Sequence, residues 1–297
     1  MTPFARILAA AAFAGLVAGA AHADENLLGY VRGAETLPKG AWEIYQFVTI
    51  RDGKAIGDYQ AVDTKTEVEY GVSNAFDVSF AFNTLSIDTQ DIRIDGYLPL
   101  DEDFTLKPSG VEFGTRYNFL RPAADGIGLS MATELSYNWI DPHSGQDKDT
   151  ISGEFALLAQ KYLMEGQLVL TGNTAVEATY AERAPIEGLP EDFEWPTDPE
   201  MEIELKAGVG AAYRFAPGWF IGAEALYETE FETEVGQERW SLFAGPSIHY
   251  GGRKFWVTAT WFPQLDGGGE KYEGQTKDLH LIEKTEQEIR LKLGINF

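Results

Sequence analysis

Cysteine is absent from this chain of 297 residues. The protein can therefore form no disulfide, no cysteine-based zinc site, no iron–sulfur cluster and no thiol nucleophile. Basic residues are scarce as well, because 23 lysines and arginines stand against 47 aspartates and glutamates, which gives a net charge of -24. Such a chain lacks the positive surface that neutralises phosphates, so we expect no nucleic-acid partner.

Long apolar stretches are also missing. The run Ile7–Ala20 has 14 residues, fewer than the roughly 20 that a transmembrane helix needs, and no later stretch is long and apolar enough. This run follows Arg6 and ends at Ala21-His22-Ala23, which has the form of an A-x-A cleavage site. We therefore interpret residues 1–23 as a secretory signal peptide.

What the chain does contain is alternation of apolar and polar residues. In the last segment, Glu286–Phe297, odd positions are apolar from Ile289 onward and even positions are mostly charged. A period of two predicts a β-strand with one apolar face. Glu202–Phe215 and Trp219–Glu232 repeat the pattern, and nine further segments fit it less fully, beginning near Trp42, Tyr59, Ala75, Val111, Ile127, Ile151, Leu168, Arg239 and Lys254. We predict twelve strands, and no segment has a sustained helical period.

The connections between these strands alternate in length. Short turns are expected at 71–74, 120–125, 164–166, 216–218 and 251–252, and longer polar loops at 51–58, 86–104, 141–149, 182–199, 233–238 and 263–284. This alternation is typical of outer-membrane barrels, with short periplasmic turns and long external loops. A face rich in Glu, Lys and Arg cannot form a dry core without a severe desolvation cost. The sequence therefore predicts an all-β fold, a transmembrane up-and-down antiparallel β-barrel over residues 41–297, with its charged face in a wet lumen.

Aromatic residues gather near both ends of the predicted strands. Trp42 and Trp219 lie next to a terminus or a short turn, whereas Tyr180 and Trp261 lie near long loops. Amphipathic rings are enriched where a barrel meets the lipid headgroups. We therefore predict two aromatic girdles.

The A-H-A signal, the alternating strands and the final strand EIRLKLGINF, which ends in Phe297, resemble those of small Gram-negative outer-membrane β-barrel proteins. This resemblance implies Sec export, location in the cell outer membrane, contact with outer-membrane lipid and lipopolysaccharide, and recognition of the Phe297 strand by the barrel-assembly machinery. The stretch GAETLPKGAWE, with TKTEVEYG after it, is also similar to an uncharacterised proteobacterial barrel family that supplies no activity. Residues 24–40 have no strand pattern, and we interpret them as a periplasmic N-terminal segment.

Residues suited to catalysis are few. His143 is next to Ser144 and close to Asp141, but three groups so close together in a loop are rarely preorganised as a triad. We interpret the histidines of the exported chain as structural or solvated. No phosphate-cradling loop follows a strand. We therefore predict no enzymatic activity and no cofactor.

One polar pattern lies beyond the outer girdle. A register set by the turn at 216–218 pairs three sets of residues, namely Glu202 with Glu232, Glu204 with Glu230, and Lys206 with Glu228. Like charges directly opposite each other are destabilising. The four glutamates form either a solvated extracellular extension or a divalent-cation site at a cation-attracting mouth.

Two functions are compatible with the predicted barrel. In the first, the protein is a porin-like passive channel or transporter for small neutral or cationic solutes. The alternative is a closed structural or surface-interaction barrel without a conducting pore. Twelve strands give a lumen between the filled eight-stranded barrels and the open sixteen-stranded porins, so the sequence leaves both functions open, as it does the oligomeric state.

Overall fold

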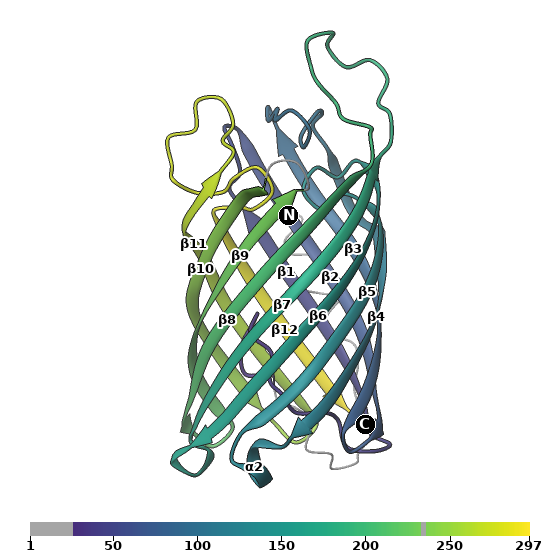
Figure 1. Ribbon diagram of the computed structural model, residues 1–297. Helices are drawn as coiled ribbons and strands as arrows, with labels where there is room; N and C mark the ends of the chain where they lie inside the picture. Colours follow the sequence, from purple (N-terminus) through teal and green to yellow (C-terminus); the bar gives the residue numbers. More distant parts are fainter. Residues whose placement is uncertain (1–25, 233–235) are drawn as a thin grey trace.

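The computed structural model describes residues 26–232 and 236–297, so the predicted signal peptide lies outside the described residues. Twelve strands form one closed antiparallel barrel, in which each strand pairs with its neighbours in sequence and β1 pairs with β12 (Figure 1). The predicted fold and strand number are confirmed. Among the described residues, no helix has the length and apolar character needed to cross a membrane.

The strands are long and their connections are uneven. Their bounds are β1 Trp42–Asp52, β2 Asp58–Ser73, β3 Phe76–Gln90, β4 Asp103–Leu120, β5 Gly128–Ile140, β6 Asp147–Leu163, β7 Leu168–Arg183, β8 Glu200–Ala216, β9 Trp219–Glu232, β10 Gly236–Gly251, β11 Phe255–Gly269 and β12 Gln287–Asn296. Two short helical turns, α2 (Pro122–Asp125) and η1 (Met164–Gly166), occupy connections at the short-turn end.

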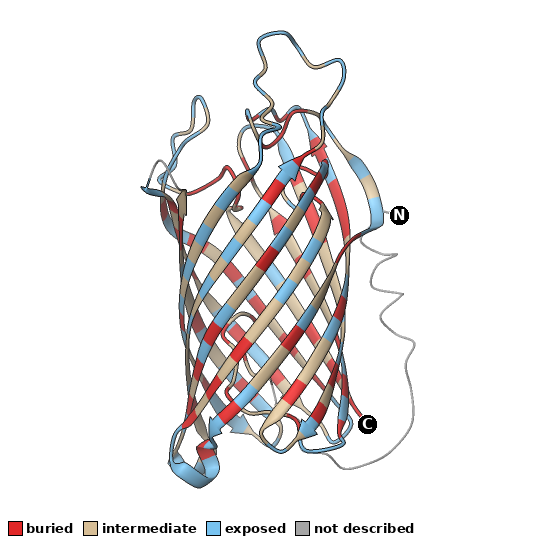
Figure 2. Cartoon of the chain, turned by 45° about the vertical axis from the view of Figure 1, so that its right-hand side comes forward, coloured by how far each residue is buried: buried red, intermediate tan, exposed pale blue. Residues whose placement is uncertain are grey.

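The two faces of the sheet differ as predicted. In β8 the side chains of Ile203, Leu205 and Val209 are exposed on the outside, whereas the alternate residues Glu204 and Lys206 are half-buried. Figure 2 shows this alternation of exposed and more buried residues along the strands. An apolar belt of this extent on a barrel is typical of a surface that faces lipid.

Exposed aromatic residues mark both edges of the belt. Those at the short-turn end are Trp42, Tyr117, Phe119, Phe215, Trp219, Phe255 and Phe297. Those toward the long loops are Tyr137, Tyr180, Tyr227 and Trp261. They match the two predicted girdles.

The predicted register between β8 and β9 is confirmed. Glu202 is paired with Glu232, Glu204 with Glu230, and Lys206 with Glu228. The register shifts only near the turn, between Arg214 and Ala216.

Several strands extend beyond their predicted limits at the long-loop end. β4 begins at Asp103 rather than near Val111, and β11 continues to Gly269 through part of the expected loop 263–284. Above the lipid both faces of a strand meet water or loops, so apolar alternation ends before the hydrogen-bonded ladder does.

The predicted N-terminal segment 24–40 has two described parts in different places. Lys39 and Gly40 donate backbone hydrogen bonds to Asn74 and Gly71 of a short turn. Residues 26–37, which we call the lumen segment, lie inside the barrel in the half nearer the short turns (Figure 1). Leu28 and Val31 pack on Ala212 and Phe220 of the wall. At Gly210 an added Cβ would lie 2.2 Å from a Leu28 methyl carbon, so a larger residue here would displace the Leu28 side chain.

The long loops fold over the opposite mouth. Loops 53–57, 91–102, 141–146 and 270–286, which we call the lid, meet around an apolar cluster with strand residues. This cluster contains Tyr59, Ala61, Leu85, Ile87, Ile92, Ile94, Tyr97, Leu98, Ile140 and Ile282. A backbone hydrogen bond of 2.7 Å from Glu286 to Gly53 joins two of the loops.

Candidate functional site

A cavity of about 600 Å³ lies in the lumen between the lid and the lumen segment. We call it the chamber. Its lid side is lined by Pro142, His143, Glu283 and Lys284, and its other side by residues of the lumen segment, Asn26, Gly29, Tyr30 and Arg32. The chamber is therefore bounded at both ends by parts of the chain that are not barrel strands.

The chamber wall is densely charged. Its ten carboxylates are Asp63, Glu67, Glu69, Asp77, Glu112, Glu134, Glu154, Glu228, Glu283 and Glu288, and its eight cations are Arg32, Arg51, Lys65, Arg116, Lys206, Lys284, Arg290 and Lys292. The charged face predicted for the lumen therefore lines the chamber, with a small excess of acidic groups.

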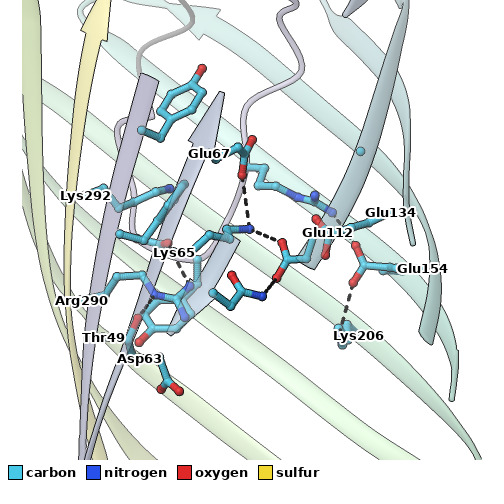
Figure 3. A pocket seen from close by; sticks show the side chains of 18 of the residues that line it. Thr49, Asp63, Lys65, Glu67, Glu112, Glu134, Glu154, Lys206, Arg290 and Lys292 are labelled. Carbon is cyan, nitrogen blue, oxygen red and sulfur yellow. Dashed lines mark hydrogen bonds and ion pairs between the residues drawn. The ribbon is translucent and has the colours of Figure 1, made fainter. Parts of the chain in front are cut away.

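Ion pairs connect strands across the chamber wall, and two of them reach past an intervening strand (Figure 3). Lys65 of β2 lies 3.3 Å from Glu67 and 2.8 Å from Glu112 of β4. Lys206 of β8 lies 3.2 Å from Glu154 of β6 and also contacts Glu177 and Glu204. The expected contact of Lys206 with Glu228 is replaced by these three, because Lys284 of the lid reaches Glu228 instead, at 3.3 Å.

Charged wall residues hold the main chain of the lumen segment. The carboxylate of Glu224 accepts hydrogen bonds from the backbone N–H groups of Gly29, Tyr30 and Val31, at 2.6, 2.8 and 2.8 Å. Lys292 donates to the carbonyl of Leu28 at 3.0 Å. One carboxylate thus accepts from three consecutive peptide donors, and hydrogen bonds to a charged acceptor are among the strong ones.

Further contacts follow the segment toward its C-terminal part. The guanidinium of Arg32 lies 2.6 Å from the Glu154 carboxylate. Asn173 both accepts from the Arg32 N–H and donates to the Arg32 carbonyl. Gln160 accepts from the N–H of Ala34 at 2.8 Å. The segment therefore contacts β6 and β7 as well as β9 and β12.

The four glutamates Glu202, Glu204, Glu230 and Glu232 are less solvated than those of an extracellular extension would be. Lys284 places its ammonium 3.2 Å from Glu204 and 3.7 Å from Glu230, and Glu230 is only 7% exposed. Glu202 and Glu232 are half-buried. The loop 270–286 folds onto this side of the mouth, so a solvated extracellular extension does not describe Glu204 and Glu230.

Burial in the lid lowers the pKa of three basic groups. Burial, with Arg51 nearby, lowers the pKa of Lys54 to about 7, and its ammonium nitrogen donates to the carbonyl of Glu283. Burial lowers the pKa of His280 to about 3. Burial, with Lys54 nearby, lowers the pKa of His143 well below its usual range. Both histidines are therefore neutral imidazoles at physiological pH.

The residues Asp141, His143 and Ser144 do not have the arrangement of a catalytic triad. The Ser144 hydroxyl donates directly to Asp141 at 2.7 Å, and the backbone N–H of His143 donates to the same carboxylate at 3.1 Å. His143 Nδ1 is buried and has no hydrogen bond within the described chain. Asp141 thus stabilises a turn, and the histidine does not link it to a nucleophile.

Comparison with known protein families assigns the chain to one of them. A family described as of unknown function (DUF6662) matches residues 20–297. The chain belongs to this family. No curated protein matches the chain at a significant level.

Solved structures share the fold at low sequence identity. The COG4313 outer membrane channel from Pseudomonas putida F1 superposes with a TM-score of 0.55 at 13% identity, over 89% of this chain and 98% of that one. The NanC porin gives 0.47 at 10% identity, over 86% and 100%, and the KdgM porin in complex with disordered oligogalacturonate gives 0.44 at 10%, over 86% and 99%. The fold is that of outer-membrane β-barrels.

Two parts of the site could not be predicted from the sequence. The lumen segment has no strand or helix period, and its hydrogen-bonded wall partners are 40 to 266 residues away along the chain. Similarly, His280, Glu283 and Lys284 lie in a polar loop that gave no indication of its position in the mouth. The inward orientation of Glu224 on β9 was predictable from alternation, but its partners were not.

Proposed function

We propose that the protein is a passive, porin-like channel of the outer membrane for small neutral or cationic solutes, narrowed in the described conformation by the lumen segment and the lid. The observation that carries this proposal is the charged chamber that fills the middle of the lumen. A charged cavity of this kind holds water and polar solutes, and its carboxylate excess favours cations. The shared fold with an outer membrane channel supports the same function.

In this proposal the protein reaches the outer membrane after Sec export, with the short turns in the periplasm and the long loops outside. The apolar belt would contact lipid and lipopolysaccharide, and the β12 strand with Phe297 would be recognised by the barrel-assembly machinery. The difference in length between connections at the two ends supports this orientation. We further propose that the barrel carries no enzymatic activity.

Single-channel recording in planar bilayers tests the proposal through Glu224. In Glu224→Gln, the side chain no longer offers a charged acceptor to three backbone N–H groups. Loss of a hydrogen bond to a charged group costs about 2 kcal/mol, which corresponds to roughly thirtyfold in the docking equilibrium of the segment. We expect rare or small openings in the wild type and much more frequent, larger openings in the variant.

Glu177→Gln is the matched control, because this lumen carboxylate contacts Lys206 and not the lumen segment. It should leave the opening frequency close to that of the wild type. Heat-dependent mobility on gels verifies that each barrel is folded. If the folded wild type and the folded Glu224→Gln variant are both silent, the channel proposal is contradicted.

The alternative function is a closed structural or surface-interaction barrel. The apolar cluster of the lid favours it, because such a cluster stabilises the mouth in a covered state. Under this alternative, weakening the lumen segment would alter stability but produce no conductance.

A further inference from the structure

A mixed histidine and carboxylate cluster lies where the lid meets the barrel wall. Glu230 is near the end of β9, and His280 and Glu283 belong to the loop 270–286. One ligand atom from each, two carboxylate oxygens and one ring nitrogen, lie within 4.8 Å of one another. All three residues are buried, with exposures of 7%, 1% and 7%.

The separations are compatible with a small metal ion. Zinc binds histidine nitrogen and carboxylate oxygen at about 2.0–2.2 Å in tetrahedral geometry. Ligand atoms around one ion are then roughly 3.4 Å apart. Because no two of the three atoms are more than 4.8 Å apart, a pair needs to approach by at most about 1.4 Å to reach that spacing, and a fourth position remains for water.

The cluster also crowds several buried carboxyl groups around few cations. Arg239 and Lys284 between them contact five carboxylates, those of Glu204, Glu228, Glu230, Glu238 and Glu283. Lys206 adds a positive charge only at Glu204. Within the described chain, the buried oxygen Glu230 Oε2 has no hydrogen-bond partner, and its nearest cation, Arg239, is 3.8 Å away. A buried carboxylate oxygen in this state is stabilised by a bound cation.

The backbone around His280 is held by one side chain of the wall. Gln264 of β11 accepts from the His280 N–H at 2.6 Å and donates to the His280 carbonyl at 3.0 Å. It also donates to the carbonyl of Thr285 at 3.1 Å. Both sides of the ligand-bearing stretch are thus fixed, as is required for a preorganised metal site.

We propose that Glu230, His280 and Glu283 form a site for a divalent transition-metal ion, zinc being the best fit, that fastens the loop 270–286 to the barrel wall. An imidazole nitrogen with two carboxylates suits zinc, whereas calcium and magnesium prefer oxygen ligands alone. Of the four glutamates that the sequence offered as a cation site, only Glu230 belongs to this set. The bound ion would join the lid to β9 and reduce the buried negative charge.

Metal titration of the purified, metal-stripped full chain in detergent tests this site. Added Co²⁺ should give a saturable visible absorption band at one equivalent, and Zn²⁺ should displace it. His280→Gln and Glu230→Gln should each weaken binding by about tenfold or more. His143→Gln, which changes another buried lid histidine outside the cluster, should bind as the wild type does.

Trypsin cleavage provides a second measurement. Lys271 and Lys277 of the same loop have side chains that are 41% and 53% exposed. Zn²⁺ should slow cleavage at these lysines in the wild type, and should not do so in folded His280→Gln. Absence of saturable binding, or equal binding by folded His280→Gln, would overturn the proposal, and neither result depends on whether the barrel conducts.

Discussion

Some ionisable residues of the lid are buried, so their charged forms lose hydration. His143 is buried and faces four charged groups, those of Arg51, Lys54, Glu283 and Lys284. Burial and the nearby Lys54 keep its pKa low, so the closed lid contains the neutral form. Once the lid is released, the imidazole regains a pKa of about 6.5.

The lid should therefore open in acid. The released state binds the proton more readily than the closed state, so closure is stable above about pH 6.5 and weakens as the pH falls below that value toward the lowered pKa. Trypsin cleavage at Lys271 and Lys277 should accelerate between pH 7.5 and pH 5, after correction for the enzyme's own pH dependence. His143→Gln should reduce this acceleration. Identical pH profiles for the two proteins would exclude a role for His143.

At the level of strands, the sequence predicted the structure wherever the two faces of a strand meet different environments. The pairing of Glu204 with Glu230 followed from alternation and one short turn, and the structure has it. The same reasoning failed at Asp103, where β4 begins, because both faces of that strand lie above the lipid belt. Apolar periodicity reports the contrast between lipid and lumen, and it does not report the hydrogen-bonded ladder itself.

The last strand gives a prediction of its own. Phe297 donates its N–H to the Trp42 carbonyl at 3.0 Å and thus helps to close the barrel between β12 and β1. Its ring is 44% exposed on the outside. Deletion of Phe297 should lower the folded protein in outer-membrane fractions several-fold, measured by heat-dependent gel mobility, whereas Phe297→Tyr should keep it. Unchanged folded yield after deletion would show that the strand needs no terminal aromatic residue.

For the whole molecule, the sequence predicted the barrel but not its contents. Each strand carries its own local pattern, so the barrel could be inferred one segment at a time. The lumen segment has no such pattern, and it lies where it does because Glu224, Asn173 and Lys292 converge on its main chain from separate strands. The site with His280 and Glu283 depends likewise on a loop that only the folded barrel positions.

Orientation of the whole barrel can be tested on intact cells. An epitope tag between Glu187 and Gly188 lies in a long loop that projects beyond the barrel (Figure 1). It should bind antibody on intact cells, whereas a tag between Gly251 and Gly252, at the short-turn end, should bind only after the outer membrane is permeabilised. Antibody access in the reverse pattern would refute the proposed orientation.

The contacts of the lumen segment also set an order for assembly. Asn26 is bound by Lys292 and Tyr30 by Glu288, across 266 and 258 residues of chain. Both partners belong to β12, so these two contacts can form only when β12 has joined the sheet. Closing loops of this length costs chain entropy, which makes the two contacts late steps in folding. Their formation therefore marks a completed barrel.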